Sequence, residues 1–228
     1  MPFERHYPAS KVEIEKPKTY NEMVELAERL ATNIPFVRVD FYEILGKIYF
    51  GELTFSPGSG FEEFSPSEWD NNIGDWIELP ESMGGGGVIY NKGYVIWVHK
   101  KDTFKVNESL TDYKFYCFNG EPRYLYVSDN LTEHENAHIS FLNMDYSKAE
   151  FKRTDYQSFE NIPTCPVTFK QMKKLAIKLS KGTKFLRVDF YEINGQIYFG
   201  ELTFYPCSGF MPFEPEKWDT NLGRMINL

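Results

Sequence analysis

Residues 185–193 read Phe-Leu-Arg-Val-Asp-Phe-Tyr-Glu-Ile, and residues 36–44 read Phe-Val-Arg-Val-Asp-Phe-Tyr-Glu-Ile. The match continues without a gap to the C-terminus, so that 29 of the 44 residues in 185–228 are identical to their counterparts in 36–79. Only two copies, so far apart along the chain, do not indicate a solenoid. They predict that the end of a domain is duplicated.

Each copy shows the same succession of expected elements. Thr19-x-x-Glu22 and Thr168-x-x-Gln171 have the pattern of a helix capping box, and apolar residues follow them at helical spacing. We therefore expect helices over 19–31 and 168–180. A strand, a turn, a second strand and a short helix complete each copy.

Different sequence lies between the copies. Residues 113–118 and 123–127 look like strands closed by Asn119-Gly120, a strong hairpin signal, and 88–90, 94–99 and 139–142 are further expected strands. Gly84–Gly87 favours a flexible junction. The sequence thus predicts an α+β fold with a mainly antiparallel sheet, flanking helices and a duplicated terminal helix–hairpin unit. The expected domains are the duplicated unit at 1–80, a junction at 81–107 and the main lobe at 108–228.

Composition excludes several classes of protein. Hydrophobic residues make up 42% of the 228-residue chain, which is enough for a core, and the net charge of −8 argues against a nucleic-acid partner. No apolar run is long enough to predict a membrane span, and the first residues do not resemble a signal peptide. Three cysteines without motif spacing favour a reduced, cytoplasmic protein.

The repeated hairpin carries the candidate site. Glu201 and Thr203 share a face of their strand because side chains alternate. If Asn194-Gly195 is a two-residue turn, Asp189 on the neighbouring strand lies on the other face of the sheet. If 193–195 is a three-residue loop, Asp189 lies on the same face as Glu201. We favour the three-residue loop, which brings Arg187, Asp189, Tyr191, Glu201 and Thr203 together.

Two carboxylates and a hydroxyl suit a hard cation such as magnesium. The alternative is a solvated polar face with an Arg187–Asp189 pair, which is common in half-buried sheets. The loop at 205–210, Tyr-Pro-Cys-Ser-Gly-Phe, can present backbone N–H groups to an anion. A turn that simply ends the strand is the alternative there.

Three motifs together carry a family resemblance. They are Arg-Val-Asp-Phe-Tyr at 187–191, Gly-Glu-Leu-Thr-Phe-x-Pro-x-Ser-Gly-Phe at 200–210 and Trp-Asp-x-Asn-x-Gly at 218–223. They resemble the C-terminal part of the TupA-like ATP-grasp family, and Asp-Tyr-Lys-Phe-Tyr-Cys-Phe-Asn-Gly-Glu-Pro at 112–122 resembles its central strand. The resemblance covers 108–228 continuously, and 17–80 repeat its last part.

The resemblance implies ATP-dependent carboxylate–amine ligation, with ATP and Mg²⁺ as cofactors. The family is associated with attaching amino acids or peptides to cell-surface polysaccharide, so a nucleotide and a polysaccharide or amino-acid substrate are the expected ligands. It implies that Asp189, Glu201 and Thr203 hold Mg²⁺ and that Lys114 and Arg187 contact the transferred phosphate. It also implies that Asp112 orients Lys114, and that Asp112, Lys114, Ser208 and Gly209 belong to the cofactor-binding residues.

The family's N-terminal lobe has no clear match in the chain. A non-catalytic relative that binds nucleotide or a partner is therefore the second hypothesis, and a protein partner that supplies the missing lobe is a further expectation. A third hypothesis is a zinc hydrolase, because 134–138 read His-Glu-Asn-Ala-His. That chemistry requires His134 and His138 on one face of a helix.

Overall fold

A computed structural model describes residues 12–34, 36–55, 64–75, 111–129 and 136–226. The chain divides into two compact units, Met1–Lys105 and Val106–Leu228, and each is described by itself. The expected strands at 88–90 and 94–99 and the glycines at 84–87 lie outside the described residues.

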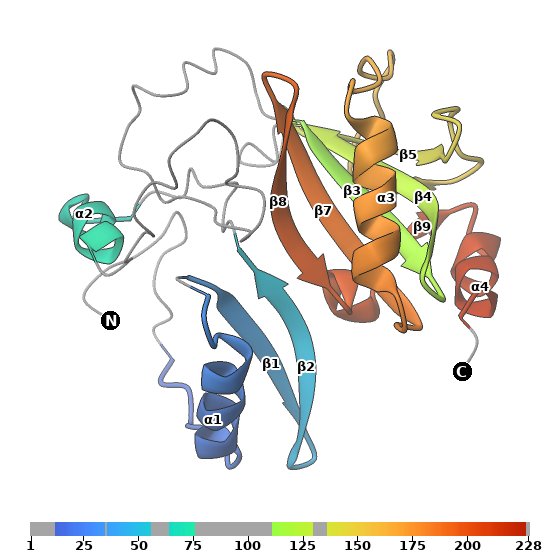
Figure 1. Cartoon of the computed structure of the whole chain (residues 1–228). Helices are drawn as coiled ribbons and strands as arrows, with labels where there is room; N and C mark the ends of the chain where they lie inside the picture. The colour runs from blue at the N-terminus through green and yellow to red at the C-terminus, as the bar shows by residue number, and fades with distance from the viewer. Residues whose placement is uncertain (1–11, 35, 56–63, 76–110, 130–135, 227–228) are drawn as a thin grey trace. The chain divides into compact units, whose positions relative to one another are not determined.

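The second unit is built on an antiparallel sheet (Figure 1). Its strands lie in the order β8-β7-β3-β4-β5. Their bounds are β3 (Asp112–Phe118), β4 (Glu121–Asp129), β5 (His138–Asn143), β7 (Phe185–Ile193) and β8 (Gln196–Thr203). Every residue of the central strand β3 is buried. The predicted α+β class with a mainly antiparallel sheet is confirmed.

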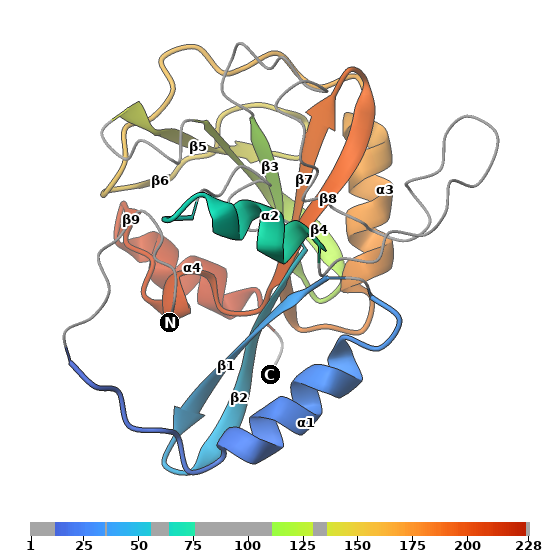
Figure 2. The same cartoon turned by 90° about the vertical axis from the view of Figure 1, so that its left-hand side faces the viewer.

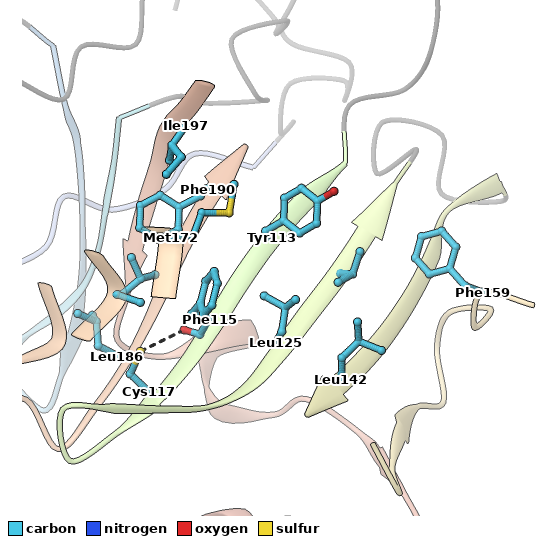
Figure 3. Packing of buried hydrophobic residues seen from close by; sticks show 13 residues of the cluster. Tyr113, Phe115, Cys117, Leu125, Leu142, Phe159, Met172, Leu186, Phe190 and Ile197 are labelled. Carbon is cyan, nitrogen blue, oxygen red and sulfur yellow. Dashed lines mark hydrogen bonds between the residues drawn. The ribbon is translucent and has the colours of Figure 1, made fainter. Parts of the chain in front are cut away.

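Both faces of this sheet are covered. Helix α3 (Phe169–Ser180) lies on one face, and helix α4 (Lys217–Arg224) lies on the other, near the short strands β6 (Lys152–Arg153) and β9 (Phe213–Glu214) (Figure 2). The strands alternate between two cores. Figure 3 shows the α3 side, where Tyr113, Phe115 and Cys117 of β3 pack with Met172 of α3. Tyr116 and Phe118 point to the α4 side.

The first unit repeats the end of the second. It contains α1 (Tyr20–Leu30), β1 (Arg38–Ile44), β2 (Lys47–Thr54) and α2 (Glu68–Asp75). The order of helix, hairpin and helix is the same as in α3, β7, β8 and α4. The repeated sequence therefore forms the same succession of elements twice.

The helices begin differently from the capping-box prediction. Neither Thr19 nor Thr168 makes a side-chain capping bond within its helix. Instead, the Thr168 N–H donates to Glu192 Oε2 over 2.8 Å. The Thr19 N–H donates to Glu43 Oε2 over 2.9 Å. A glutamate from the following strand therefore binds the start of each helix, and ties helix to hairpin.

Candidate functional site

The hairpin turn is shorter than predicted. Ile193 pairs with Gln196, so Asn194 and Gly195 form a two-residue turn in which both have positive φ, 53° and 72°. The prediction of a three-residue loop is wrong. A two-residue turn alone would place Asp189 and Glu201 on opposite faces, so another feature must bring them together.

That feature is a β-bulge at Gly200. The β7–β8 register shifts between Val188 and Phe190, which lets the extra residue of β8 restore a common face for the two carboxylates. A Cβ on Gly200 would lie 3.0 Å from a ring carbon of Tyr191 and 3.3 Å from the Asp189 carbonyl oxygen. Glycine therefore permits the close approach that the bulge needs.

Arg187 joins the two carboxylates. Its Nε donates to Asp189 Oδ1 over 2.9 Å and its Nη2 to Oδ2 over 2.8 Å. The same Nη2 donates to Glu201 Oε1, which also accepts a 2.6 Å bond from Thr203 Oγ1. These four side chains therefore meet on one face of the hairpin.

Lys114 reaches the same face from β3, where it is the register partner of Asp189. Its Nζ lies 3.0 Å from Asp189 Oδ2 and 3.2 Å from Asp112 Oδ1. Ser128 of β4 donates to Asp112 Oδ2 over 3.5 Å. We call Asp112, Lys114, Asp189, Arg187, Glu201 and Thr203 the ionic row. Sequence reasoning missed Ser128, because only the β3–β4 register brings it to Asp112.

Most of the ionic row is buried, while Arg187 and Glu201 are partly exposed. Asp189 is 0% exposed and Lys114 8% exposed, so the solvated face of the alternative is wrong for this copy, whereas the Arg187–Asp189 pair that it expected is present. Burial by itself lowers the pKa of Lys114, but Asp112 and Asp189 outweigh it and hold that pKa well above its ordinary value. Burial opposes the charge of Arg187 too, and Asp189 and Glu201 still raise its pKa. Burial raises the pKa of Asp189, and the two neighbouring cations oppose that rise.

The oxygens of Asp189, Glu201 and Thr203 are the ligand type that Mg²⁺ prefers. The Arg187 guanidinium binds both carboxylates, so a metal ion would share them with it. Across the described residues, no group of three or more His, Cys, Asp or Glu side chains is arranged to hold a metal ion. The donor set therefore fits Mg²⁺ in kind, and further oxygen ligands would have to come from a bound phosphate.

The loop after β8 is tightly wound. Cys207, Ser208 and Gly209 all have positive φ, 50°, 55° and 82°, which is costly for the first two. The Ser208 N–H donates to the Tyr205 carbonyl oxygen over 3.0 Å. That N–H is thus bound within the loop, whereas Gly209 lines a neighbouring pocket.

The zinc hypothesis fails at His138. This residue begins strand β5 and is not helical, and its Nδ1 lies 3.4 Å from Asp129 Oδ1. His134 lies outside the described residues. The single helix that the zinc chemistry requires therefore does not include His138.

The first copy repeats the contacts with much greater exposure. Arg38 binds Asp40 and Glu52, and Thr54 Oγ1 donates to Glu52 Oε1 over 2.9 Å. The side chains of Arg38 and Asp40 are 41% and 37% exposed. Their counterparts Arg187 and Asp189 are 12% and 0% exposed. The two copies thus share the bonding pattern but differ in their surroundings.

Comparison with known proteins identifies one family. The family model described as TupA-like ATPgrasp matches residues 1–78 and 94–227. No curated protein and no solved structure gives a significant match. In the part of the chain that the structure describes, no helix has the length and apolar character needed to span a membrane.

Proposed function

Because the chain belongs to the TupA-like ATP-grasp family, we propose that it is an ATP-grasp-type carboxylate–amine ligase whose site is the ionic row of the second unit. The observation that carries this proposal is the convergence of Lys114, Arg187, Asp189 and Glu201 on one face from three adjacent strands. This arrangement supports phosphate chemistry because it combines fixed cations with carboxylates that suit a divalent ion.

The proposed reaction has two chemical steps. A substrate carboxylate oxygen attacks the γ-phosphorus of ATP, and the bond to the bridging oxygen breaks to give an acyl phosphate and ADP. An amine then attacks the acyl carbon, the amide forms, phosphate leaves, and the nitrogen loses a proton. Both steps build negative charge on phosphoryl oxygens, which fixed cations stabilise.

In this proposal Lys114 and Arg187 stabilise the transferred phosphoryl group. Neighbouring carboxylates raise the pKa of both groups, so both stay charged at neutral pH. Asp112, held by Ser128, positions Lys114. Mg²⁺ would be held by Asp189, Glu201 and Thr203, and when bound it would neutralise charge on the ATP phosphates. Ser208 would border the nucleotide, and Gly209 would lie between the nucleotide and the neighbouring pocket that it lines.

The remaining parts of the proposal rest on the family. They are a cytoplasmic role in cell-surface polysaccharide biosynthesis, a polysaccharide or amino-acid substrate, and domains at 1–80 and 108–228 joined by 81–107. A partner chain would supply the N-terminal lobe. A relative that binds nucleotide or a partner without catalysis is the competing function, because Arg187 already binds both carboxylates that a metal ion would share.

Calorimetric titration of ATP, with and without Mg²⁺, tests the site. Glu201→Gln should abolish Mg²⁺-dependent binding, whereas Glu52→Gln, the same change in the exposed copy, should leave most of it. Equal losses would contradict the assignment to the second unit. If the unmutated chain binds no ATP with Mg²⁺ present, the ligase proposal fails and a partner-binding role is favoured.

A further inference from the structure

A pocket of about 640 Å³ adjoins the ionic row on the same face of the sheet. Along β3, Lys114, Tyr116 and Phe118 share that face, and along β7 Asp189, Arg187 and Phe185 do so. Tyr116 of the pocket is the register partner of Arg187. The pocket therefore begins where the row of charges ends, and its size is in the range of about 300–1,000 Å³ typical of small-molecule sites.

The pocket wall is mainly apolar. Phe118 and Phe185 pack edge to face with ring centroids 5.1 Å apart. Met211 and Leu222 close the side opposite the sheet and are themselves buried. Such a wall suits an aliphatic or aromatic side chain.

Two opposite charges also line the pocket, those of Lys184 and Asp219. Both residues are exposed, so their charged groups can meet a ligand at the pocket mouth. An ammonium suits Asp219 and a carboxylate suits Lys184. A polyanion such as a nucleotide would pair with Lys184 but would be repelled by Asp219.

We propose that this pocket binds the amine substrate, and that this substrate is an amino acid with an apolar side chain of the leucine, methionine or phenylalanine kind. Lys184 pairs with its carboxylate, Asp219 with its ammonium, and the aromatic wall takes its side chain. The proposal rests on the ligase function, because it places the amine donor beside the residues that handle the acyl phosphate.

The test is calorimetric titration of the full chain with L-phenylalanine in the absence of nucleotide. L-Phenylalanine should bind at least about tenfold more tightly than L-glutamate, which lacks the apolar side chain, and than 2-phenylethylamine, which lacks the carboxylate. Lys184→Gln should weaken the binding of L-phenylalanine at least about fivefold. Lys178→Gln, the same change on the exposed side of α3, should leave it unchanged.

A second variant fills the pocket. Leu222→Trp should abolish binding of L-phenylalanine while the chain keeps the circular dichroism spectrum of the unmutated protein. No binding of L-phenylalanine to the unmutated chain, equal binding of L-glutamate, or no effect of Lys184→Gln would overturn the proposal. ATP binding without amino-acid binding would overturn this inference alone, and amino-acid binding without ATP binding would overturn the ligase function alone.

Discussion

Lys114 is a buried ammonium whose charge is balanced by two carboxylates, Asp112 and Asp189. Removing one partner of a buried ion pair leaves an uncompensated charge. Lys114→Met should therefore lower the free energy of unfolding by about 3–5 kcal/mol. Urea denaturation measures this change, and Lys178→Met on the surface of α3 should stay within about 0.5 kcal/mol of the unmutated protein. A loss below about 1 kcal/mol would show that the carboxylates are solvated in solution.

Ionisation of Tyr126 makes the stability of the folded protein depend on pH in the alkaline range. Its hydroxyl lies 3.4 Å from Arg153 Nη1, and burial raises the pKa of Tyr126 from 10.0 to about 12. In the folded state the phenol keeps its proton to higher pH than in the unfolded chain. Its contribution to stability is thus complete below pH 10 and is lost as the pH rises to about 12.

The expected loss follows from the two pKa values. A shift of this size corresponds to about 3 kcal/mol between pH 10 and pH 12. The free energy of unfolding of the unmutated protein should fall over that range by about 2–3 kcal/mol more than that of Tyr126→Phe. Denaturant titrations at several pH values measure both, and parallel curves would contradict the prediction.

At the scale of the element, the hairpin depends on the bulge at Gly200. Gly200→Ala would bring a methyl group within 3.0 Å of the Tyr191 ring, so the variant should lose about 1–3 kcal/mol of stability. Gly51→Ala should act in the same direction, since its Cβ would lie 2.8 Å from the Tyr42 ring. Gly223→Ala in α4 meets no atom within 4 Å and should be stabilising by about 0.5–1 kcal/mol. A Gly200→Ala variant as stable as Gly223→Ala would show that the bulge tolerates a side chain.

Helices and turns could be predicted from nearby residues, whereas features that depend on strand pairing could not. Periodic apolar residues and the Asn194-Gly195 turn predict the helices and the hairpin, because those signals lie within a few residues of one another. The bulge was not predicted, since it shows only in the pairing register of β7 with β8. Asp189 and Glu201 share a face as predicted, but the bulge brings them together and the predicted three-residue loop does not exist. Glu192 was missed as the partner of Thr168 because the two are 24 residues apart.

The residues of the candidate site could be predicted in part. The resemblance to a family indicated Lys114, Arg187, Asp189 and Glu201, but residue patterns alone could not choose between a solvated face and a buried one. That choice depends on the neighbouring strand, because β3 pairs with β7 beside the row and brings Lys114 to Asp189. The pocket lined by Lys184 and Asp219 could not be predicted either, because its residues come from separate stretches of the chain.

At the scale of the whole molecule, the two copies should respond unequally to the same substitution. Asp189 is 0% exposed and Asp40 is 37% exposed. Asp189→Asn should lower the free energy of unfolding by about 3 kcal/mol or more, because it leaves Lys114 and Arg187 short of a negative charge. Asp40→Asn should cost about 1 kcal/mol or less, since exposed pairs contribute little. Differential scanning calorimetry of the full chain compares them, and similar losses would contradict the difference in burial.

The helices that begin the two copies, α3 and α1, also differ in burial, and this difference affects how fast each helix opens. Helix α3 buries Met172, Ala176 and Ser180, whereas α1 has no buried residue. Amide hydrogens exchange with solvent when a segment opens, and a helix with few buried contacts opens without the rest of its domain. In deuterium oxide at neutral pH, the amides of α3 should therefore exchange at least about a hundredfold more slowly than those of α1. Two stretches with the same pattern of residues would then open at very different rates, each set by the surface against which its helix is packed.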